Sequence, residues 1–511
     1  MIIFDVAACA PTRHLSALIL YLFNTHVMLR PLLFTFLLCF LLPVSHATTW
    51  HIGPTRTYSY CSQVAGQVQN GDTILIDAAT YVNDPQVIWN KSDLYIAGIG
   101  GRPRLEAGSI IANDMSNGKG IFVISGSNVH VHNIEFARAV VQDNNGAGIR
   151  QEGANLWVSN CRFDSNEMGI LGGNIANCKT TVEYCEFVHN GSIFNPGYQH
   201  NIYINHIDSL VFRFNYSHDA IAEGHELKSR ATYNFILYNR IANETGDDSR
   251  TIDLPNGGTS VIVGNIIEQG PNSANSNVLG YGLEGLTNNA PHHLFCCNNT
   301  FINKKANGSF IQVANGMDTL FVKNNIFAGP RPGGLLVGTP TVLDSSNNAI
   351  NSDLNVFGLV DVAGYDYHLL SDAPVIDKGV MLTGSVLGHP LQPILEYKDT
   401  CYYTSREVSG TIDIGAYEFA TTLATTENSF GEITLFPNPA SGAVQILLVE
   451  QAYKVSVAQL INNLGAVVRT QNLQPGNNAV DITGLISGVY YILVVLDKHR
   501  EVRKILIQQD L

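Results

Sequence analysis

The stretch that decides the fold runs from Gly197 to Gly258 and reads GYQHNIYINHIDSLVFRFNYSHDAIAEGHELKSRATYNFILYNRIANETGDDSRTIDLPNGG. Three five-residue segments within it align at a constant offset of 25 residues, at 201–205 (NIYIN), 226–230 (ELKSR) and 251–255 (TIDLP). Repetition of a short strand-like unit is typical of folds in which successive coils stack on one another. The stretch therefore predicts strands stacked at equivalent positions of successive coils.

Side chains alternate between the two faces of a strand, which sorts these segments into two rows. One row is apolar and suits a core: Ile202, Leu227 and Ile252. The opposite row carries a phenol, an amine and a carboxylate: Tyr203, Lys228 and Asp253. By the same parity we expect further polar side chains on this outer face: Asn201, Asn205, Glu226, Arg230 and Thr251. A core alone does not require a lysine between a tyrosine and an acid, so we take the outer face as the candidate active site.

The same kind of unit recurs along most of the chain. From Ile121 onward, a strand, a turn and a second strand repeat at a spacing of roughly 22–32 residues. The repeats read VHVHNIEFARA, LWVSNCRFDSN, TTVEYCEFVHN, LVFRFNYSHDA, NFILYNRIANE, VIVGNIIEQG, HLFCCNNTFIN and LFVKNNIFAG. We predict an all-β fold, a right-handed parallel β-helix over residues 48–420, in which each coil buries its apolar face against its neighbours. A β-sandwich is the alternative, but these segments lack hairpin turns.

Two of the cysteines lie inside these repeats, Cys161 in NCRF and Cys185 in YCEF. No cysteine has the spacing of a zinc site. We therefore predict that Cys161 and Cys185 are buried and stacked as small hydrophobic side chains.

The composition limits the class of protein and of partner. Of 511 residues, 45% are hydrophobic and only 14% are charged, which suits a well-buried β protein. The net charge of −14 argues against nucleic acid as the main partner. A local group of cations can still create a field that attracts an anionic glycan, and Lys228, Arg230 and Arg250 form such a group in the sequence.

The N-terminus is typical of a secretory signal. From Met28 it shows a basic Arg30, an apolar run from Leu32 to Leu42 and a small-x-small cleavage site that ends at Ala47. We expect residues 1–47 to be the signal region, with the true start at Met28. The apolar run is shorter than the roughly 20 residues that a membrane-spanning helix needs.

The C-terminal end carries two further patterns. The segments YDYHLLSDAPVIDKGV and GTIDIGAYEF resemble the terminal coil of secreted parallel β-helix proteins. A Thr/Ser-rich linker at 421–429 separates them from residues 430–511, a series of alternating strands of a length that suits a small β-sandwich.

That last segment resembles the C-terminal sorting domain of the type IX secretion system of Bacteroidetes. The resemblance is carried by the FPNP box at 436–439, Gly488-Val489-Tyr490 and Lys504-Ile505-Leu506. It implies recognition by the type IX machinery, export across the outer membrane, and a secreted or cell-surface location.

The outer row contains the residue types that β-elimination of a uronate requires. The substrate carboxylate must be neutralised, a base must take the C5 proton, and an acid must protonate the leaving oxygen. We assign Lys228 as the base, because a lysine beside another cation has a lowered pKa, and Tyr203 as the acid. Arg230 or Arg250 supplies the neutralising charge. His200 and His225, at the strand entrances, could replace the base or acid, or cap turns.

Extending the register predicts a longer groove that binds an acidic polysaccharide. The row gains Arg150, Leu171, Tyr281 and Gln312. The substrate-binding residues we expect are Arg150, His200, Asn201, Asn205, Glu226, Arg250, Asp253, Asn256 and Tyr281. Asn256 is equally well explained as part of the tight turn Asn256-Gly257-Gly258.

Part of this stretch resembles a known enzyme family. Lys228-Ser229 followed by Asn239 resembles the Lys-Ser coil of polysaccharide lyase family 6, the alginate and dermatan lyases. The resemblance implies an exported lyase of uronate-containing glycans and leaves calcium as a candidate ion, with no cofactor otherwise expected. In that family the next coil carries Arg-His-Gly, whereas residues 254–257 here read LPNG.

Three other functions of this face stay open. Lys228 could form a salt bridge with Glu226 or Asp253 on a solvated sheet face. Glu226 and Asp253 could be the paired carboxylates of a glycoside hydrolase. A non-catalytic glycan-binding or adhesin β-helix is the third alternative, because the same solenoid hosts enzymes and binders. We expect a monomer in each case.

Overall fold

The computed structural model describes residues 47–108, 119–419, 433–436, 440–448, 456–462, 467–474, 476–496 and 499–508. The described residues are almost entirely β-strands and turns, with short helices α2 (Ser62–Ala65) and η1 (Leu354–Phe357). No helix in these ranges is long and apolar enough to cross a membrane. Residues 1–46 of the expected signal region, the linker at 421–429 and Pro437–Pro439 of the FPNP box lie outside the described residues.

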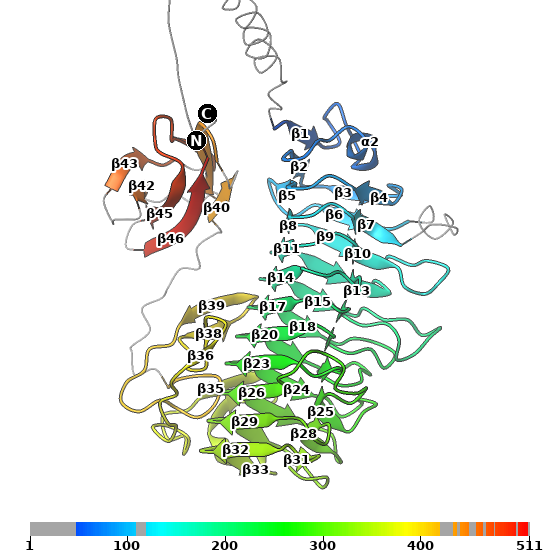
Figure 1. The fold of residues 1–511 in the computed structure, drawn as a ribbon, viewed down its shortest axis with the longest axis vertical. Helices are drawn as coiled ribbons and strands as arrows, with labels where there is room; N and C mark the ends of the chain where they lie inside the picture. The colour runs from blue at the N-terminus through cyan, green and yellow to red at the C-terminus, as the bar shows by residue number, and fades with distance from the viewer. Residues whose placement is uncertain are drawn as a thin grey trace, which may run out of the picture. The chain divides into compact units, whose positions relative to one another are not determined.

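Residues 49–108 and 119–351 wind into a stack of coils whose strands form three parallel sheets (Figure 1). Sheet A consists of β1 (Thr49–Ile52), β2 (Thr73–Asp77), β5 (Tyr95–Ile99), β8 (Val129–His132), β11 (Leu156–Ser159), β14 (Lys179–Glu183), β17 (Ser209–Arg213), β20 (Tyr233–Leu237), β23 (Thr259–Val263), β26 (His293–Cys297), β29 (Thr319–Lys323) and β32 (Val342–Ser346).

Sheets B and C follow sheet A in each coil. Sheet B consists of β3 (Thr80–Val82), β6 (Arg104–Glu106), β9 (Glu135–Ala137), β12 (Arg162–Asp164), β15 (Glu186–Val188), β18 (Tyr216–His218), β21 (Arg240–Ala242), β24 (Ile266–Gln269), β27 (Thr300–Asn303), β30 (Ile326–Ala328) and β33 (Ala349–Asn351). Sheet C consists of β4 (Val87–Trp89), β7 (Gly120–Ile124), β10 (Ala147–Gln151), β13 (Met168–Gly172), β16 (Ile202–Ile204), β19 (Leu227–Ser229), β22 (Ile252–Leu254), β25 (Asn277–Tyr281), β28 (Ser309–Val313) and β31 (Leu336–Val337).

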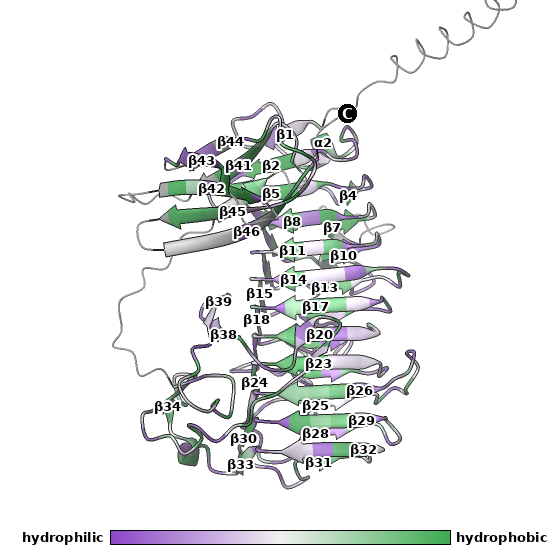
Figure 2. Ribbon diagram, turned by 60° about the vertical axis from the view of Figure 1, so that its left-hand side comes forward, coloured by the Kyte–Doolittle hydropathy of each residue, from purple (hydrophilic) through white to green (hydrophobic). Residues whose placement is uncertain are grey.

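The core fills the space between the three sheets. Inward side chains stack on their equivalents in the next coil: the rings of Phe136, Phe163 and Phe187 follow one another at centroid distances of 5.3 and 4.7 Å. Figure 2 shows that the strands of sheet A carry both hydrophilic and hydrophobic residues, as expected when one face is buried and the other is not. The predicted parallel β-helix is confirmed.

A ladder of asparagines lines the turn between sheets A and B. The members donate their backbone N–H to the side-chain oxygen of the equivalent residue in the next coil, at about the same distance each time: 2.9 Å from Asn215 to Asn239, 2.9 Å from Asn239 to Asn265 and 3.0 Å from Asn265 to Asn299. The ladder continues through Asn325 to Asn348. Because the side chains from Asn215 to Asn325 are buried, these asparagines satisfy polar groups that water does not reach.

Cys161 and Cys185 occupy the ladder position in the coils before Asn215. Both are buried and unbonded to another sulfur, and the N–H of Cys161 points at the Sγ of Cys185 at 3.4 Å. The N–H of Cys185 in turn donates to Asn215 Oδ1 at 2.9 Å. The prediction that these cysteines are buried and stacked is confirmed.

Residues 352–419 differ from the expected terminal coil. Their strands pair only with one another, in antiparallel pairs: β34 (Leu359–Asp361) with β35 (Asp366–Leu369), β36 (Ser385–Val386) with β37 (His389–Pro390), and β38 (Leu395–Lys398) with β39 (Tyr402–Ser405). The last coil of the helix ends at β33, within the segment VLDSSNNAINSDLN. Residues 352–419 do not form a further coil because they return along the outside of the helix and pack against it (Figure 1).

The returning segment covers part of the outer faces of sheets A and B. It packs on sheet A through the ring of His389, which stacks on Phe235 at 3.9 Å. It packs on sheet B through Tyr367, whose hydroxyl donates to Glu268 Oε2 at 2.6 Å. No hydrophobic cluster among the described residues joins this segment to sheet C.

The described C-terminal residues form a small β-sandwich, as predicted. One sheet contains β40 (Ile433–Phe436), β41 (Ala443–Leu448) and β44 (Gly476–Asp481). The other contains β42 (Ser456–Asn462), β43 (Val467–Asn472), β45 (Gly488–Leu496) and β46 (His499–Ile507). Both contribute to one core, which includes Ile446, Val480, Ile492 and Ile505.

Candidate functional site

The outer row of sheet C has the register that strand alternation predicts. Arg150 pairs with Leu171, Leu171 with Tyr203, Tyr203 with Lys228, and Lys228 with Asp253. Parallel strands lie about 4.8 Å apart, so successive members of this row are close enough to contact one sugar chain.

Tyr281 does not belong to this row, which corrects the sequence prediction. In β25 the residue opposite Asp253 is Gly280, and Tyr281 pairs with Leu254. Leu279 must face the core beside Ile252, and this turns Tyr281 inward, where it is buried. Its hydroxyl donates to the carbonyl of Gly258 at 2.5 Å, so Tyr281 supports the turn after β22 and does not face a ligand.

Asn201 and Glu226 are also buried, contrary to their predicted place on the outer face. Asn201 Nδ2 donates to Glu226 Oε2 at 2.5 Å, and the backbone N–H of Ala220 donates to Glu226 Oε1 at 2.8 Å. Burial, with the charge of Asp248 nearby, raises the pKa of the Glu226 carboxyl well above its usual value. The prediction failed because these residues precede the first strand residue and lie in a turn, where alternation does not hold. Thr251 is buried for the same reason.

The burial of Glu226 also removes it from the predicted hydrolytic pair. A carboxyl inside the turn cannot reach a glycosidic bond on the outer face. A hydrolase of this type needs two carboxyl groups on that face. Asp253 remains there, and the second carboxyl group is that of Glu284, because both contact Lys228 Nζ, at 3.1 and 2.9 Å.

His200 and His225 form a stacked pair at the entrance to β16 and β19. Their ring centroids are 4.8 Å apart. His200 Nδ1 accepts the N–H of His225 at 3.0 Å, and His225 Nδ1 accepts the N–H of Arg250 at 3.1 Å. Burial, together with the charges of Lys228 and Arg250, lowers the pKa of His225 well below its usual value. Both rings therefore cap turns as neutral imidazoles, with each Nδ1 facing a backbone N–H.

An ion-pair network occupies the centre of the row. Lys228 Nζ lies 3.1 Å from Asp253 Oδ2 and 2.9 Å from Glu284 Oε1. Arg230 Nη2 lies 2.6 Å from Glu284 Oε2. The predicted salt bridge of Lys228 with Asp253 is present, whereas Glu226 takes no part in it. Glu284, which comes from the loop after β25, was not predicted.

Arg230 links this network to the phenol of Tyr203. Its Nε donates to Tyr203 Oη at 2.9 Å, and its Nη1 donates to Asn256 Oδ1 at 2.5 Å. Asn256 in turn donates to Thr287 Oγ1 at 2.7 Å. The guanidinium is thus fixed in one orientation, with the tyrosine hydroxyl as one of its partners. Asn256 is buried and serves this positioning, as its turn position suggests.

Arg250 lies across the empty position of Gly280. A Cβ at Gly280 would approach the Cδ of Arg250 to 2.9 Å, so only glycine leaves room for this side chain. Arg250 Nη1 lies 3.3 Å from Asp253 Oδ1 and its Nε donates to Asn277 Oδ1 at 3.2 Å. Arg250 therefore neutralises Asp253 from the side opposite Lys228.

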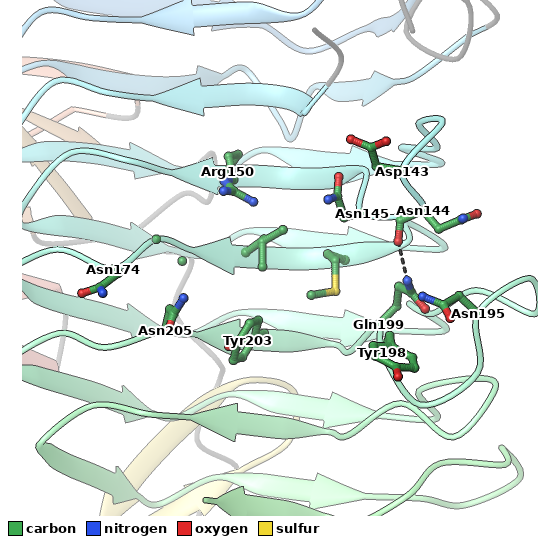
Figure 3. Close-up of a pocket in the computed structure, with 14 residues that line it drawn as sticks. Asp143, Asn144, Asn145, Arg150, Asn174, Asn195, Tyr198, Gln199, Tyr203 and Asn205 are labelled. Carbon is green, nitrogen blue, oxygen red and sulfur yellow. Dashed lines mark hydrogen bonds between the residues drawn. The ribbon is translucent and has the colours of Figure 1, made fainter. Parts of the chain in front are cut away.

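A pocket of about 360 Å³ adjoins the network on the N-terminal side (Figure 3). Its floor is the outer face of β10, β13 and β16, and its walls come from the loop residues 143–145 and 195–199. Figure 3 shows Arg150, Tyr203 and Asn205 along the strands, with Tyr198 and Gln199 on the loop. The remaining lining residues are Asp143, Asn144, Asn145, Met168, Leu171, Gly172, Gly173, Asn174 and Asn195.

The pocket is lined by one arginine, two tyrosines and several amide side chains, together with Asp143 and the apolar Met168 and Leu171. Arg150 Nε is buried without a hydrogen-bond partner, and its nearest carboxylate oxygen, on Glu152, is 3.6 Å away. Tyr203 is shared with the ion-pair network, so the two regions are continuous. Tyr198 is exposed at the rim. A cation, two phenols and several amides suit a ligand with a carboxylate and many hydroxyls.

The walls of the pocket come from residues that were not among the predicted substrate-binding residues. Gln199 bridges the two loops by donating to the carbonyl of Asn144 (Figure 3). The sequence SIFNPGY at 192–198 could have indicated a binding loop, because large apolar residues are unusual in a turn-rich segment. These residues are Ile193, Phe194 and Tyr198, and all three are exposed.

The described part of the chain contains no group of three or more His, Cys, Asp or Glu side chains arranged to hold a metal ion. We therefore assign no residue to calcium.

Comparisons with known proteins bear on the C-terminal segment. Among solved structures, ORF18 of Geobacillus virus E2 is similar at 12% identity over 86% of this chain and 71% of that chain, with a TM-score of 0.22 that supports no inference. No curated protein matches the chain significantly. Residues 434–508 match the family described as the secretion system C-terminal sorting domain. The protein is thus exported by the type IX system to the cell surface or beyond it.

Proposed function

We propose that this exported β-helix binds an acidic, uronate-containing polysaccharide in the groove over sheet C and cleaves it by β-elimination. One observation carries the proposal: the hydroxyl of Tyr203, held at 2.9 Å by Arg230 Nε, lies at the junction of the pocket and the ion-pair network. A phenol beside a fixed guanidinium is suited to proton transfer, because the cation stabilises the phenolate that remains.

The reaction places three demands on the site. A base removes the C5 proton, the electrons of that C–H bond form the C4=C5 double bond, and the C4–O bond breaks. The leaving oxygen takes a proton from an acid. The sugar carboxylate must be neutralised, so that charge at C5 is stabilised.

We assign these roles to residues at the junction. Tyr203 protonates the leaving oxygen, and Arg150 or Arg230 neutralises the carboxylate. Lys228 lies next to Tyr203 in the register and takes the C5 proton as a neutral amine, after it has left its carboxylate partners, Asp253 and Glu284, and has lost its own proton to water.

A second candidate function is binding without cleavage. The observation that favours it is the pairing of Lys228 with two carboxylates, since a lysine held as an ion pair serves as a positive charge and not as a base. In that case the groove retains a glycan at the cell surface through Arg150, Tyr203 and the amides of the pocket.

The test is the ultraviolet absorbance of unsaturated uronate when the purified exported protein acts on a panel of uronate polysaccharides. The decisive variant is Tyr203→Phe, which removes one oxygen, and the matched control is Tyr60→Phe on the exposed N-terminal segment. Product that forms with the wild type and the control, and falls at least about 100-fold in Tyr203→Phe, supports the proposal.

Two other outcomes separate the candidates. Retention of uronate glycans on a column without product, equal in the wild type and Tyr203→Phe, identifies a binding protein. Absence of both product and retention overturns the assignment of an acidic glycan to this groove.

A further inference from the structure

Glu284 is placed as a bound carboxylate would be. Its two oxygens contact two different cations, Lys228 Nζ at 2.9 Å and Arg230 Nη2 at 2.6 Å. The side chain of Glu284 is 46% exposed, whereas those of Lys228 and Arg230 are 12% and 17% exposed. The carboxylate therefore lies on the solvent side and covers the two cations.

The backbone that carries Glu284 is anchored independently of this contact. The N–H of Glu284 donates to the carbonyl of Pro255 at 3.0 Å, and the N–H of Asn288 donates to that of Asn256 at 3.0 Å. Asn288 Nδ2 also donates to the carbonyl of Gly257 at 2.9 Å. The Glu284 side chain can therefore swing away without unfolding the loop.

Lys228 and Arg230 differ in the partners that they keep when the Glu284 side chain moves away. Lys228 keeps Asp253 at 3.1 Å, and Arg230 keeps only the uncharged Tyr203 and Asn256. Removing Glu284 thus leaves one positive charge without an anion, directly beside the phenol that borders the pocket. A uronate carboxylate that enters from the pocket has the same chemistry as the carboxylate that left.

We infer that Lys228 and Arg230 form a binding site for one carboxylate and that Glu284 is its built-in occupant, which a uronate of the glycan displaces. The inference deepens the proposed function and rests on its assignment of the sheet C groove to an acidic glycan. On displacement, Lys228 exchanges the carboxylate of Glu284 for that of the uronate and keeps Asp253.

The test compares the affinity of the full exported protein and its Glu284→Gln variant for oligomers of galacturonate, glucuronate and mannuronate, with a neutral glucose oligomer as the negative probe. Glutamine keeps the shape and removes the charge. We expect Glu284→Gln to bind a uronate oligomer about fivefold more tightly, and to leave the neutral oligomer unchanged. The matched control is Glu223→Gln, an exposed glutamate in the loop before β19.

A second variant keeps the test decisive if Glu284→Gln folds poorly. Glu284→Ala should show the same tightening, and adding Arg230→Gln should abolish it.

Unchanged or weaker binding in Glu284→Gln overturns the inference, as does an equal gain in Glu223→Gln or no uronate binding by any variant. Tighter binding without unsaturated product supports the inference while the proposed cleavage fails. If the wild type and Glu284→Gln form unsaturated product at equal rates and bind uronate equally, the proposed cleavage is supported and the inference about Glu284 is overturned.

Discussion

The asparagine ladder and the outer row of sheet C are both stacks of polar side chains, yet their composition differs. In the ladder the same residue recurs from Asn215 to Asn348, and each member bonds to the next. In the outer row Tyr203, Lys228 and Asp253 follow one another without repetition. A solenoid satisfies buried polar groups with identical, self-complementary residues, because every coil presents the same environment. Departure from repetition on an exposed face therefore indicates function.

The ladder should be the more sensitive of the two stacks to mutation. Asn265 accepts two hydrogen bonds from Asn239, both at 2.9 Å, and its Nδ2 donates to Asn299 Oδ1 at 2.9 Å and to the carbonyl of Ile236 at 2.8 Å. We expect Asn265→Ala to lower the free energy of unfolding by about 3 kcal/mol, because it leaves several buried groups unpaired. Urea denaturation measures this loss.

Two further variants sharpen that result. Asn265→Cys should recover part of the loss, because Cys185 fills the same ladder position and accepts an N–H. Asn272→Ala, at an exposed position, should change the stability by less than about 0.5 kcal/mol. A cost for Asn265→Ala as small as that of Asn272→Ala would mean that the ladder is not a structural element.

Carboxyl groups show the same contrast between interior and outer face. Asp253 and Glu284 are paired with cations, whereas Asp248 is buried, accepts a hydrogen bond from Asn243 Nδ2 on one oxygen and has no partner for the other. Burial raises the pKa of Asp248 to about 8. In the unfolded chain an aspartate has a pKa of about 3.9. Between these values the folded state holds a proton that the unfolded state lacks, so this group lowers the stability as the pH rises.

Asp248→Asn should remove that pH dependence. We expect the variant to match the wild type near pH 4 and to be more stable by about 1–3 kcal/mol at pH 8, from urea denaturation across this range. Asp208→Asn, at an exposed aspartate, is the matched control and should show no such trend. A gain that is equal at all pH values would mean that the Asp248 carboxyl is already ionised in the folded protein at pH 4.

The sequence predicted the elements whose determinants are local. Alternation placed Tyr203, Lys228 and Asp253 in register, and the recurring Asn and Cys positions indicated stacking. The same rule misplaced Asn201 and Glu226, because it applies only inside a strand. It misplaced Tyr281 because the length of the preceding turn, which sets the register of β25, is not visible from alternation. Glu284, the pocket walls and the cover formed by residues 352–419 depend on contacts between distant coils, for which a single sequence carries no local signal.

The smallest effect that we expect is the change in uronate affinity when the positive charge of Arg150 is removed from the pocket. Arg150 lines the pocket, and its Nε has no hydrogen bond and lies 3.6 Å from Glu152, whereas Arg138 on the outside of sheet B pairs with Glu106 at 2.8 Å. We expect Arg150→Gln to weaken the binding of a uronate oligomer about threefold at low salt, with Arg138→Gln unchanged, by titration calorimetry. Because the interaction is electrostatic and partly solvated, the difference should shrink as the salt concentration rises. Equal affinity of wild type and Arg150→Gln would show that the amides and phenols of the pocket bind the sugar, leaving Lys228 and Arg230 as the site of its charge.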